Sequence, residues 1–227
     1  MKNLTEDEVR KLSGMPDAAF NQHVLWDSTG LNPDNCNKIL LIYKKVVNHF
    51  DIKYWLTYGT ALGFYRSGDF IPWDDDIDSH IDGHKMLEVG VENIRQKFID
   101  EGVVVRSKER GLNSKMSLFY GGVKMQLQGV YEQDGMMHAK LFHYPIEFYN
   151  NSQVFQYRGE EYTLPGPPDR YLTFCYDENW STPQDIKDWR DYMNPKQLKS
   201  RRWLSDYDSY NANKIKGKKI NDSKEES

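Results

Sequence analysis

Four aspartates lie close together in the segment Trp-Asp-Asp-Asp-Ile-Asp at residues 73–78. On an extended chain Asp74, Asp76 and Asp78 project to one side and Asp75 turns to the other, because successive side chains of a strand alternate. Like charges this close repel one another unless a cation lies between them. Carboxylate oxygens suit a hard divalent ion, and Mg²⁺ carrying substrate phosphates fits best, with Mn²⁺ as the alternative. The segment therefore predicts chemistry on phosphates through a bound metal.

Two other interpretations of the acidic segment are weaker. A solvated acidic loop does not suit its apolar neighbours, which run from Phe70 to Trp73 and continue at Ile77. A calcium loop of the EF-hand type has Gly at its sixth position and Glu at its twelfth. This chain has Ser79 and Lys85 at those two places. The metal-and-phosphate interpretation is therefore preferred.

Cations and aromatic side chains near the acidic segment are the next candidates. Arg66 and Lys115 are predicted to hold phosphate, since a diphosphate needs cations opposite it. An ordinary surface role is the alternative for each of them. Trp73 and Trp180 could stack on a base or an acceptor, but packing in the core is the expectation for both.

Strands and helices must bring these residues together. Residues 54–58 are aromatic and β-branched, which predicts a strand, and residues 59–66 are expected to form a short helix directly after it. Residues 76–81 predict a second strand, so the acidic segment is expected to run into the sheet. The other elements predicted before residue 110 are a helix over 34–50 that Asp34 or Asn35 caps, a helix over 83–101 and a strand over 103–105.

Two hairpins are predicted in the second half of the chain. Residues 115–131 form the first, with its turn at Gly121-Gly122. In its second arm apolar side chains alternate with Lys124, Gln126 and Gln128, which predicts one buried and one polar face. Residues 153–164 form the second hairpin, and a helix is expected to start after the prolines at 165–168.

Composition limits the class of protein. At 227 residues the chain suits one main domain, expected over 34–213, with a helical preface over 1–33 and a charged, disordered tail over 214–227. A net charge of -4 argues against binding to nucleic acid. Two cysteines fit neither a disulfide scaffold nor a structural zinc site. No membrane span and no signal segment is recognised, so a cytoplasmic location is expected.

Residues 56–66 and 70–78, which read LTYGTALGFYR and FIPWDDDID, resemble the signature of the LicD/fukutin family. That family is a branch of the nucleotidyltransferase-fold superfamily and includes bacterial phosphocholine transferases and animal ribitol-phosphate transferases. A weaker match follows within residues 161–183, where a proline after a strand, a Tyr-Leu helix and a Trp-x-x-Pro close occur in the family's order. The resemblance extends over about residues 54–183.

The resemblance implies an α+β fold with a mixed β-sheet flanked by helices, like that of nucleotidyltransferases. It implies that a turn at Gly59 and Thr60 holds nucleotide phosphates. It also implies that Asp76 and Asp78 bind Mg²⁺, with Asp74 at an additional acidic position of the family. The residue types agree, because glycine lets backbone approach a phosphate and a threonine hydroxyl can bond to it. Metal ions would neutralise the transferring phosphoryl group and orient attack by a hydroxyl.

One position departs from the family pattern. Gln126 stands where the family has a third acidic residue on a later strand. An amide oxygen can ligate Mg²⁺ but cannot act as a general base. Glu132 or Asp134 would take that place if the register of the strand were shifted. The resemblance thus gives Asp76, Asp78 and Gln126 as the catalytic residues.

The function that the resemblance implies is transfer of a phospho-alcohol group, such as phosphocholine or ribitol phosphate. The donor would be CDP-linked, the acceptor would be a hydroxyl of a glycan or glycolipid, and CMP would be released. A first alternative is a nucleotidyltransferase that moves NMP from an NTP and releases pyrophosphate. A second alternative is a homologue that binds nucleotide or glycan without turnover, because Gln126 replaces a carboxylate.

Overall fold

The centre of the molecule is a mixed β-sheet. A computed structural model describes residues 4–23, 25–28, 30–183 and 194–197. Five strands lie side by side in the order β1-β2-β5-β4-β3. They are β1 (Tyr54–Leu56), β2 (Ile77–Asp82), β3 (Val104–Lys108), β4 (Lys115–Tyr120) and β5 (Val123–Gln133). β2 and β5 run parallel and the other neighbours antiparallel, which confirms the predicted α+β class with a mixed sheet.

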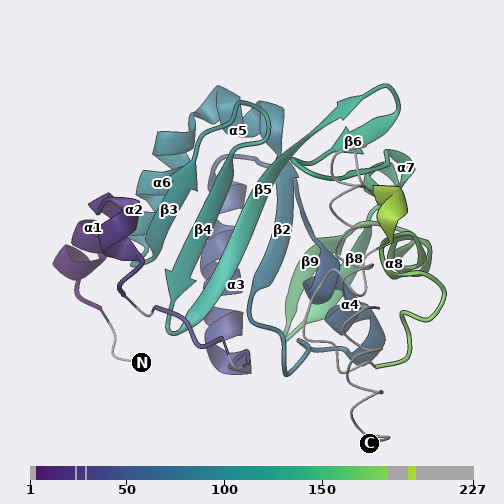
Figure 1. Ribbon diagram of the computed structural model, residues 1–227, viewed down its shortest axis with the longest axis horizontal. Helices are drawn as coiled ribbons and strands as arrows, with labels where there is room; N and C mark the ends of the chain where they lie inside the picture. The colour runs from purple at the N-terminus through teal and green to yellow at the C-terminus, as the bar shows by residue number, and fades with distance from the viewer. Residues whose placement is uncertain (1–3, 24, 29, 184–193, 198–227) are drawn as a thin grey trace, which may run out of the picture.

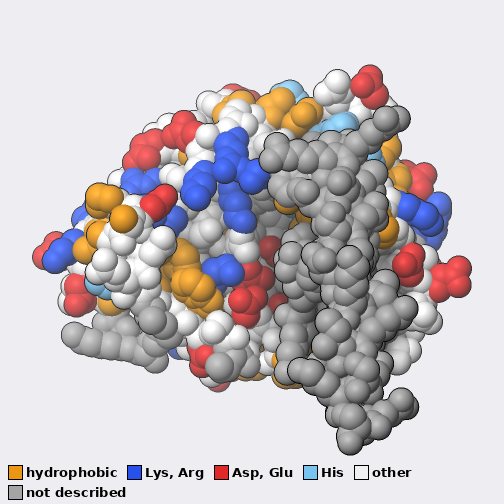
Figure 2. Space-filling view, viewed as in Figure 1, with side chains coloured by type: hydrophobic (Ala, Val, Ile, Leu, Met, Phe, Trp, Pro, Cys, Tyr) orange, Lys and Arg blue, Asp and Glu red, His pale blue; other side chains and the backbone are white. Residues whose placement is uncertain are grey.

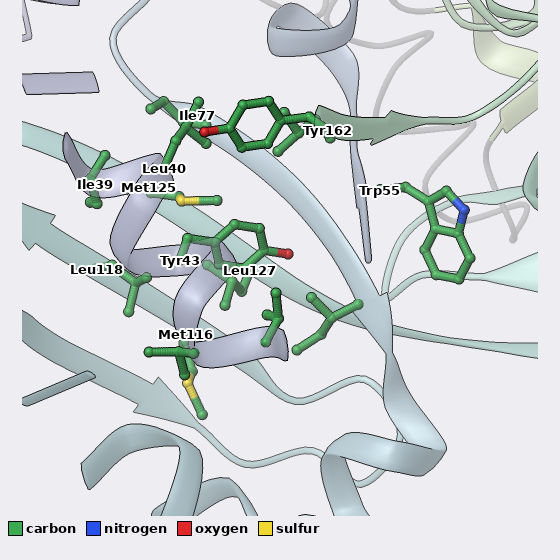
Figure 3. Packing of buried hydrophobic residues seen from close by; sticks show 14 of the residues in the cluster. Ile39, Leu40, Tyr43, Trp55, Ile77, Met116, Leu118, Met125, Leu127 and Tyr162 are labelled. Carbon is green, nitrogen blue, oxygen red and sulfur yellow. The ribbon is translucent and has the colours of Figure 1, made fainter. Parts of the chain in front are cut away.

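One face of this sheet is covered by α3 (Pro33–His49), α5 (Gly83–Val89) and α6 (Val91–Asp100). Figure 1 shows α3 crossing behind the strands and α6 beside β3. The alternation predicted for β5 is confirmed, since Met125 and Leu127 are fully buried while Lys124 and Gln126 are only partly buried. Figure 3 shows Leu40 of α3 close to Met125 in this core. The polar face of β5 is therefore turned away from α3.

A buried hydrogen bond fixes α3 against β2. The hydroxyl groups of Tyr43 and Ser79 lie 2.6 Å apart, and both residues are almost completely buried. Ser79 is the neighbour of Asp78 in the strand, and successive side chains of a strand point to opposite faces. Tyr43 and Ser79 therefore set which face of β2 is turned toward the helices, and Asp78 faces the other way.

A second layer lies at the β1 end of the sheet. It holds α4 (Tyr58–Ser67), α8 (Pro168–Tyr176) and the hairpin of β8 (Gln153–Tyr157) and β9 (Glu160–Leu164). Phe64 of α4 stacks on Phe155 and Tyr157 of the hairpin, with ring centroids 5.1 and 4.7 Å apart. This aromatic packing holds α4 in place, as the offset geometry of such pairs favours. β6 (Met136–His138) and β7 (His143–Pro145) extend the central sheet, since β6 pairs with the end of β5 and β7 pairs with β6, and α7 (Glu147–Asn150) packs against β7.

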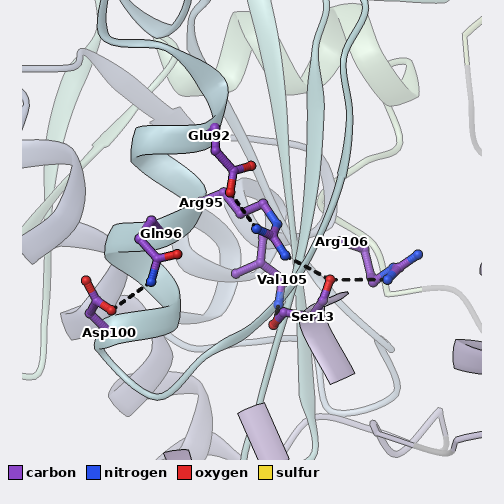
Figure 4. A network of polar contacts seen from close by, with 7 residues as sticks. All are labelled: Ser13, Glu92, Arg95, Gln96, Asp100, Val105 and Arg106. Atoms are coloured by element: carbon purple, nitrogen blue, oxygen red, sulfur yellow. Dashed lines mark hydrogen bonds and ion pairs between the residues drawn. The ribbon is translucent and has the colours of Figure 1, made fainter. Parts of the chain in front are cut away.

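Two short helices, α1 (Glu6–Gly14) and α2 (Asp17–Phe20), pack near the opposite edge. A capping box of Thr5 and Glu8 starts α1. Ser13 then joins α1 to the sheet, because its hydroxyl accepts the amide of Val105 at 3.0 Å and its carbonyl accepts Arg95 at 2.9 Å (Figure 4). The expected helical preface is thus helical over these residues and is bound to β3 and α6.

Several predicted boundaries are wrong for physical reasons. The helix expected over 83–101 is two helices, because Gly90 has φ 90°, a conformation that interrupts a helix and favours glycine. The cap of α3 is Asn32, whose side chain accepts the amide of Asn35, so neither Asp34 nor Asn35 caps it. The first strand stops at Leu56. β6, β7 and α7 were not predicted, since segments of three or four residues carry too little periodicity.

The two ends of the chain are described only in part. No helix among the described residues is long and apolar enough to cross a membrane. The tail predicted over 214–227 lies outside the described residues, and η2 (Pro195–Gln197) is the last described element. The domain boundaries and the cytoplasmic location stay predictions.

Candidate active site

The site begins at the junction between β1 and α4. Thr57 follows the strand, and Tyr58 opens α4 with φ 49°, a left-handed conformation that is rare for a bulky residue. The next residue is Gly59, where a Cβ atom would lie 2.3 Å from Oδ2 of Asp74. Glycine is therefore required so that the Asp74 carboxylate can pack against the first turn of α4. Gly59 also lines the cavity, so the phosphate contact expected there stays a prediction.

The acidic segment lies just before β2 rather than inside it. Asp74, Asp75 and Asp76 offer carboxylate oxygens that all lie within 4.8 Å of one another. The expectation that Asp75 turns to the other face is wrong, because these three residues precede the strand and do not alternate as strand residues do. Asp78 does lie in β2 and lines the same cavity. We call these four residues the carboxylate cluster.

Burial makes the negative charges of the cluster unfavourable. Burial, and then the neighbouring Asp76 carboxylate, raises the pKa of Asp74 to about 7. Burial, followed by Asp76 and Asp74, also raises the pKa of Asp78 well above its usual range. Such shifts mean that the ionised form lacks enough cationic partners within the protein. Hard oxygen donors in this state suit a divalent cation.

β5 supplies the partners of the cluster. Gln126 pairs with Asp78 in the parallel register of β2 and β5, and its side-chain amide donates to Oδ2 of Asp76. The ammonium of Lys124 lies 2.8 Å from the same oxygen, and it also lies 5.3 Å from the ring centre of Trp26. Although burial opposes it, Asp76 raises the pKa of Lys124. Sequence reasoning placed Lys124 on the polar face of the strand but gave it no role.

The predicted phosphate-binding residues are placed differently from one another. Lys115 and Arg66 both line the cavity, and burial lowers the pKa of Lys115. Arg66 donates to the carbonyl of Trp180 at 3.4 Å, and its Nε is buried without a partner among the described residues. Thr60 is buried, and its hydroxyl accepts the backbone amide of Asp78 at 3.0 Å. Thr60 therefore positions β2 and does not line the cavity.

These side chains surround a cavity of about 900 Å³ on the polar face of the sheet. Figure 2 shows a hollow in this face with acidic side chains on one side and Lys and Arg side chains on the other. Trp73 stands at the cavity with 51% of its surface exposed, so the expectation that it packs in the core is wrong. Trp180 is partly buried, and its indole donates to Thr173 at 3.2 Å. Tyr58, His80, Phe142 and Tyr176 also line the cavity.

The shifted-register alternative for the third carboxylate is wrong. Glu132 lies further along β5, opposite Met137 of β6, and it lines a separate cavity of about 650 Å³. Asp134 lies in the turn between β5 and β6 and is exposed. Gln126, and neither Glu132 nor Asp134, therefore faces the carboxylate cluster from the expected position on β5.

Comparison with protein families gives a match over much of the chain. The family described as LicD/FKTN/FKRP, nucleotidyltransferase domain, matches residues 51–166. Ribitol-5-phosphate transferase FKTN from Macaca fascicularis and that from Homo sapiens are each 23% identical over 176 residues. The match covers 69% of this chain and 35% of each relative, so the chain spans about a third of their length.

Solved structures with a similar arrangement are more distant. The lincosamide antibiotic adenylyltransferase LnuA, bound to lincomycin, is 18% identical, covers 57% of this chain and 79% of its own, and has a TM-score of 0.40. The antibiotic-resistance factor ANT(2'')-Ia in solution is 14% identical, covers 58% of this chain and 66% of its own, and has a TM-score of 0.41.

Proposed function

Because this chain belongs to the LicD/FKTN/FKRP nucleotidyltransferase domain family, we propose that it is a Mg²⁺-dependent transferase of phospho-alcohol groups. The donor is a CDP-linked alcohol such as CDP-choline or CDP-ribitol, the acceptor is a hydroxyl of a glycan or glycolipid, and CMP is released. The observation that carries the proposal is the carboxylate cluster, where four half-buried acids line a cavity with Lys115 and Lys124.

The residues present fit a divalent cation. Three carboxylates place oxygens within 4.8 Å of one another, and burial, followed by the neighbouring Asp76 carboxylate, raises the pKa of Asp74. Asp74 and Asp76 would hold Mg²⁺ with Asp78 beside them, and Mn²⁺ has the same ligand preference. When bound, the ion would neutralise the phosphoryl oxygens of the donor and template in-line attack. Removal of the ion should therefore abolish turnover.

The cations and the exposed tryptophan account for donor binding. Lys115 is partly buried on β4, so its charge acts in a less polar medium than water. Arg66 lies at the cavity with a buried, unpartnered Nε among the described residues. Both would bind the diphosphate, and the exposed ring of Trp73 would stack on the cytosine base.

Gln126 has a positioning role in this proposal. Its amide donates to Asp76 and so fixes the orientation of that carboxylate. An amide takes no proton, but phosphoryl transfer through a loose transition state depends mainly on positioning and charge neutralisation. Replacement of a carboxylate by Gln126 is therefore compatible with turnover.

Product analysis tests the proposal. The protein is incubated with CDP-choline, CDP-ribitol or CDP-glycerol, Mg²⁺ and a panel of saccharides, and phosphorus NMR follows the donor. We expect CMP to form with one donor, and to stop on addition of EDTA. Formation of pyrophosphate from an NTP would instead identify a nucleotidyltransferase. No release of CMP from any donor would contradict the proposal.

One observation favours a second candidate, a protein that binds nucleotide without turnover. Oδ2 of Asp76 already has two protein partners, Lys124 and Gln126, and Lys124 carries the positive charge that a metal would bring. Calorimetry with CDP-choline and Mg²⁺ would then give binding while NMR gives no CMP. The variant Gln126→Asp separates the two candidates, because it restores a third carboxylate and would gain turnover only if the native protein lacks it.

A further inference from the structure

A second cavity, of about 650 Å³, lies at the other end of β2 from the carboxylate cluster. The last residue of β2, Asp82, lines it together with Val130, the partner of Asp82 in β5. No described residue lines both cavities, although the bonded pair of Tyr149 and His80 connects them, since Tyr149 lines the second cavity and His80 lines the first. Sites for small molecules have volumes of about 300 to 1,000 Å³, so the second cavity has the size of a binding site.

The different lengths of β2 and β5 create this cavity. The parallel pairing of the two strands ends at Asp82 and Val130, but β5 continues to Gln133 and pairs with β6. Figure 1 shows the ribbon of β5 and β6 continuing past the end of β2. Side chains from α7 and β9, such as Asn150 and Thr163, line the space where β2 has ended. The cavity is therefore formed by the backbone arrangement of the sheet.

Aromatic rings held by their neighbours form part of the lining. Tyr54, Trp55 and Tyr131 line the second cavity. Trp55 is 7% exposed and meets the ring of Tyr149 edge-on at 5.0 Å, and Tyr131 stacks on His138 at 5.4 Å. Rings fixed in this way offer apolar surface without losing much freedom when a ligand binds. The C–H face of a sugar ring is a suitable partner for such a surface.

Polar side chains that both donate and accept hydrogen bonds share the lining with these rings. The amides of Asn48 and Asn150 and the hydroxyl of Ser152 make no side-chain hydrogen bond to another described residue. Asp82 accepts two backbone amides of α5 with one oxygen, Oδ1, and neither Asp82 nor Glu132 forms an ion pair within the described part of the chain. Amides, hydroxyls and carboxylates together match a ligand whose hydroxyls donate and accept.

The charges of the lining argue against two other kinds of ligand. The described lining has two carboxylates, Asp82 and Glu132, against the single lysine Lys53, so an anionic ligand would be repelled. Among the described residues, the acids whose oxygens are spaced to hold a metal ion belong to the carboxylate cluster and not to the second cavity. An uncharged ligand with many hydroxyls fits the lining better than a phosphate or a divalent cation.

We propose that the second cavity binds an uncharged saccharide. The amides and carboxylates of the lining would bond to its hydroxyls, and the aromatic rings would contact its C–H face. This inference goes beyond the proposed function, because it assigns a glycan site that contains no residue of the carboxylate cluster. Binding at this site requires no donor, no metal ion and no transfer reaction.

Paired double variants test the proposal. Glu132→Ala/Asn150→Ala removes two polar groups of the second cavity, and both residues are exposed, so the fold should persist. The matched control Asn21→Ala/Glu109→Ala removes the same two residue types at exposed positions that line neither cavity. The probes are three neutral tetrasaccharides: maltotetraose, cellotetraose and mannotetraose. Dissociation constants are measured by NMR titration of the full chain.

The wild-type protein should bind at least one of the three saccharides, and Glu132→Ala/Asn150→Ala should weaken that binding by about tenfold, the effect of two lost hydrogen bonds. The control variant should keep the wild-type affinity. Trp73→Ala, which changes the main cavity, should also keep it. No binding of any of the three saccharides would overturn the proposal, and so would an equal loss in the control. A loss in Trp73→Ala alone would place the saccharide in the main cavity and would also overturn it.

Two further measurements locate the ligand and identify its class. The imidazole resonances of His84, which lines the second cavity, should shift as saccharide is added, whereas those of the exposed His23, which lines neither cavity, should not. Bound saccharide with unmoved His84 resonances would overturn the proposal. Tighter binding of spermidine than of any saccharide, lost in Glu132→Ala, would identify a cationic amine as the ligand and would also overturn it. A wild type that binds saccharide here but turns over no donor contradicts the proposed function alone.

Discussion

One face of β2 carries two groups of polar side chains, one of acids and one of neutral residues. At its start, the carboxylate cluster gathers four acids, and the pKa of Asp78 is raised because burial and neighbouring charges oppose its ionisation. Further along the strand, His80 is 1% exposed and lies among tyrosines, where its Nδ1 is 2.7 Å from the hydroxyl of Tyr149. In the first region burial and neighbouring charges oppose ionisation of the acids, whereas the second is stabilised by uncharged hydrogen bonds and ring contacts. We call the second region the tyrosine cluster.

The difference separates the candidate binding site from the scaffold that supports it. In the tyrosine cluster, the hydroxyls of Tyr58 and Tyr144 lie 2.5 Å apart, and the ring of Tyr58 meets His80 edge-on at 5.2 Å. Neutral groups that bond one another in this way stabilise the fold without a ligand. Buried like charges do the reverse, because they store repulsion that a ligand relieves. A change confined to one region therefore shows whether the other region responds.

The largest expected effect is a loss of stability at low pH, which acts through His80 in the tyrosine cluster. Burial lowers the pKa of His80 to about 3 from its ordinary value of 6.5. A depressed folded-state pKa gives stability that is present above pH 6.5 and lost as the pH falls toward 3, because the unfolded state takes up the proton first. The expected loss is about 4 to 5 kcal/mol across that window. Urea unfolding at several pH values measures it.

The control for this prediction is His80→Gln, which puts a polar amide in place of the imidazole near Tyr149 and does not titrate. Its free energy of unfolding should fall less between pH 6.5 and pH 3 than that of the wild type. Parallel curves for the two proteins would show that His80 titrates normally and that the tyrosine cluster is open to water.

Asp78→Asn should lower activity without lowering stability. Turnover of the CDP-alcohol should fall by about 10³-fold, equivalent to about 4 kcal/mol, because one charge that faces the cation is lost. The melting temperature without metal should stay equal or rise. A raised folded-state pKa means that the ionised form opposes folding at pH values above the unfolded-state pKa, and asparagine removes that charge.

Asp134→Asn is the matched control for Asp78→Asn. Asp134 has φ 54°, which asparagine tolerates, and it is exposed in the turn after β5. Both activity and melting temperature should stay unchanged. A loss of activity in Asp134→Asn similar to that in Asp78→Asn would show that this turn takes part in catalysis.

Mg²⁺ should stabilise the native protein through the carboxylate cluster alone. At about 100 times its dissociation constant, a ligand that binds one site of the folded state adds about 2.7 kcal/mol of stability. Thermal unfolding with and without Mg²⁺ measures this increase. The increase should disappear in Asp76→Asn and persist in His80→Gln, which leaves the cluster intact. Equal increases in both variants would place the cation elsewhere.

The sequence predicted the regular elements better than the contacts between them. The alternation in residues 123–128 predicted the buried and polar faces of β5, and the turn at Gly121-Gly122 predicted its hairpin with β4. Lys124 received no role, since its partner Asp76 is distant in sequence and only the register of β2 on β5 brings the two together. Asp75 was misplaced because alternation was applied to residues that precede the strand. Local pattern thus predicts elements, and long-range register decides the site.

The tyrosine cluster was missed for a related reason. Its tyrosines come from α4, β7, α7 and α8, so no spacing in the sequence links Tyr58 to Tyr144, Tyr149 or Tyr171. The high aromatic content, 14%, was a signal for aromatic packing but could not place it. His80 in its turn follows Asp78 by two residues, a strand spacing that puts both on one face. That spacing was the one local sign that the cavity continues past the acids.

Tyr144→Phe should have the smallest effect, and it tests whether the tyrosine cluster is scaffold. The change removes a hydroxyl that lies 2.5 Å from that of Tyr58, in a residue that is fully buried. Loss of one buried hydrogen bond should lower the free energy of unfolding by about 1 to 2 kcal/mol. Tyr65→Phe is the control, because Tyr65 is exposed and should lose nothing measurable. kcat should change less than threefold in both variants, since neither hydroxyl is among the groups proposed to bind phosphate or metal. A large fall in kcat for Tyr144→Phe with unchanged stability would instead mean that the hydroxyl pair of Tyr58 and Tyr144 acts on the substrate, and the two regions of β2 would then form one site.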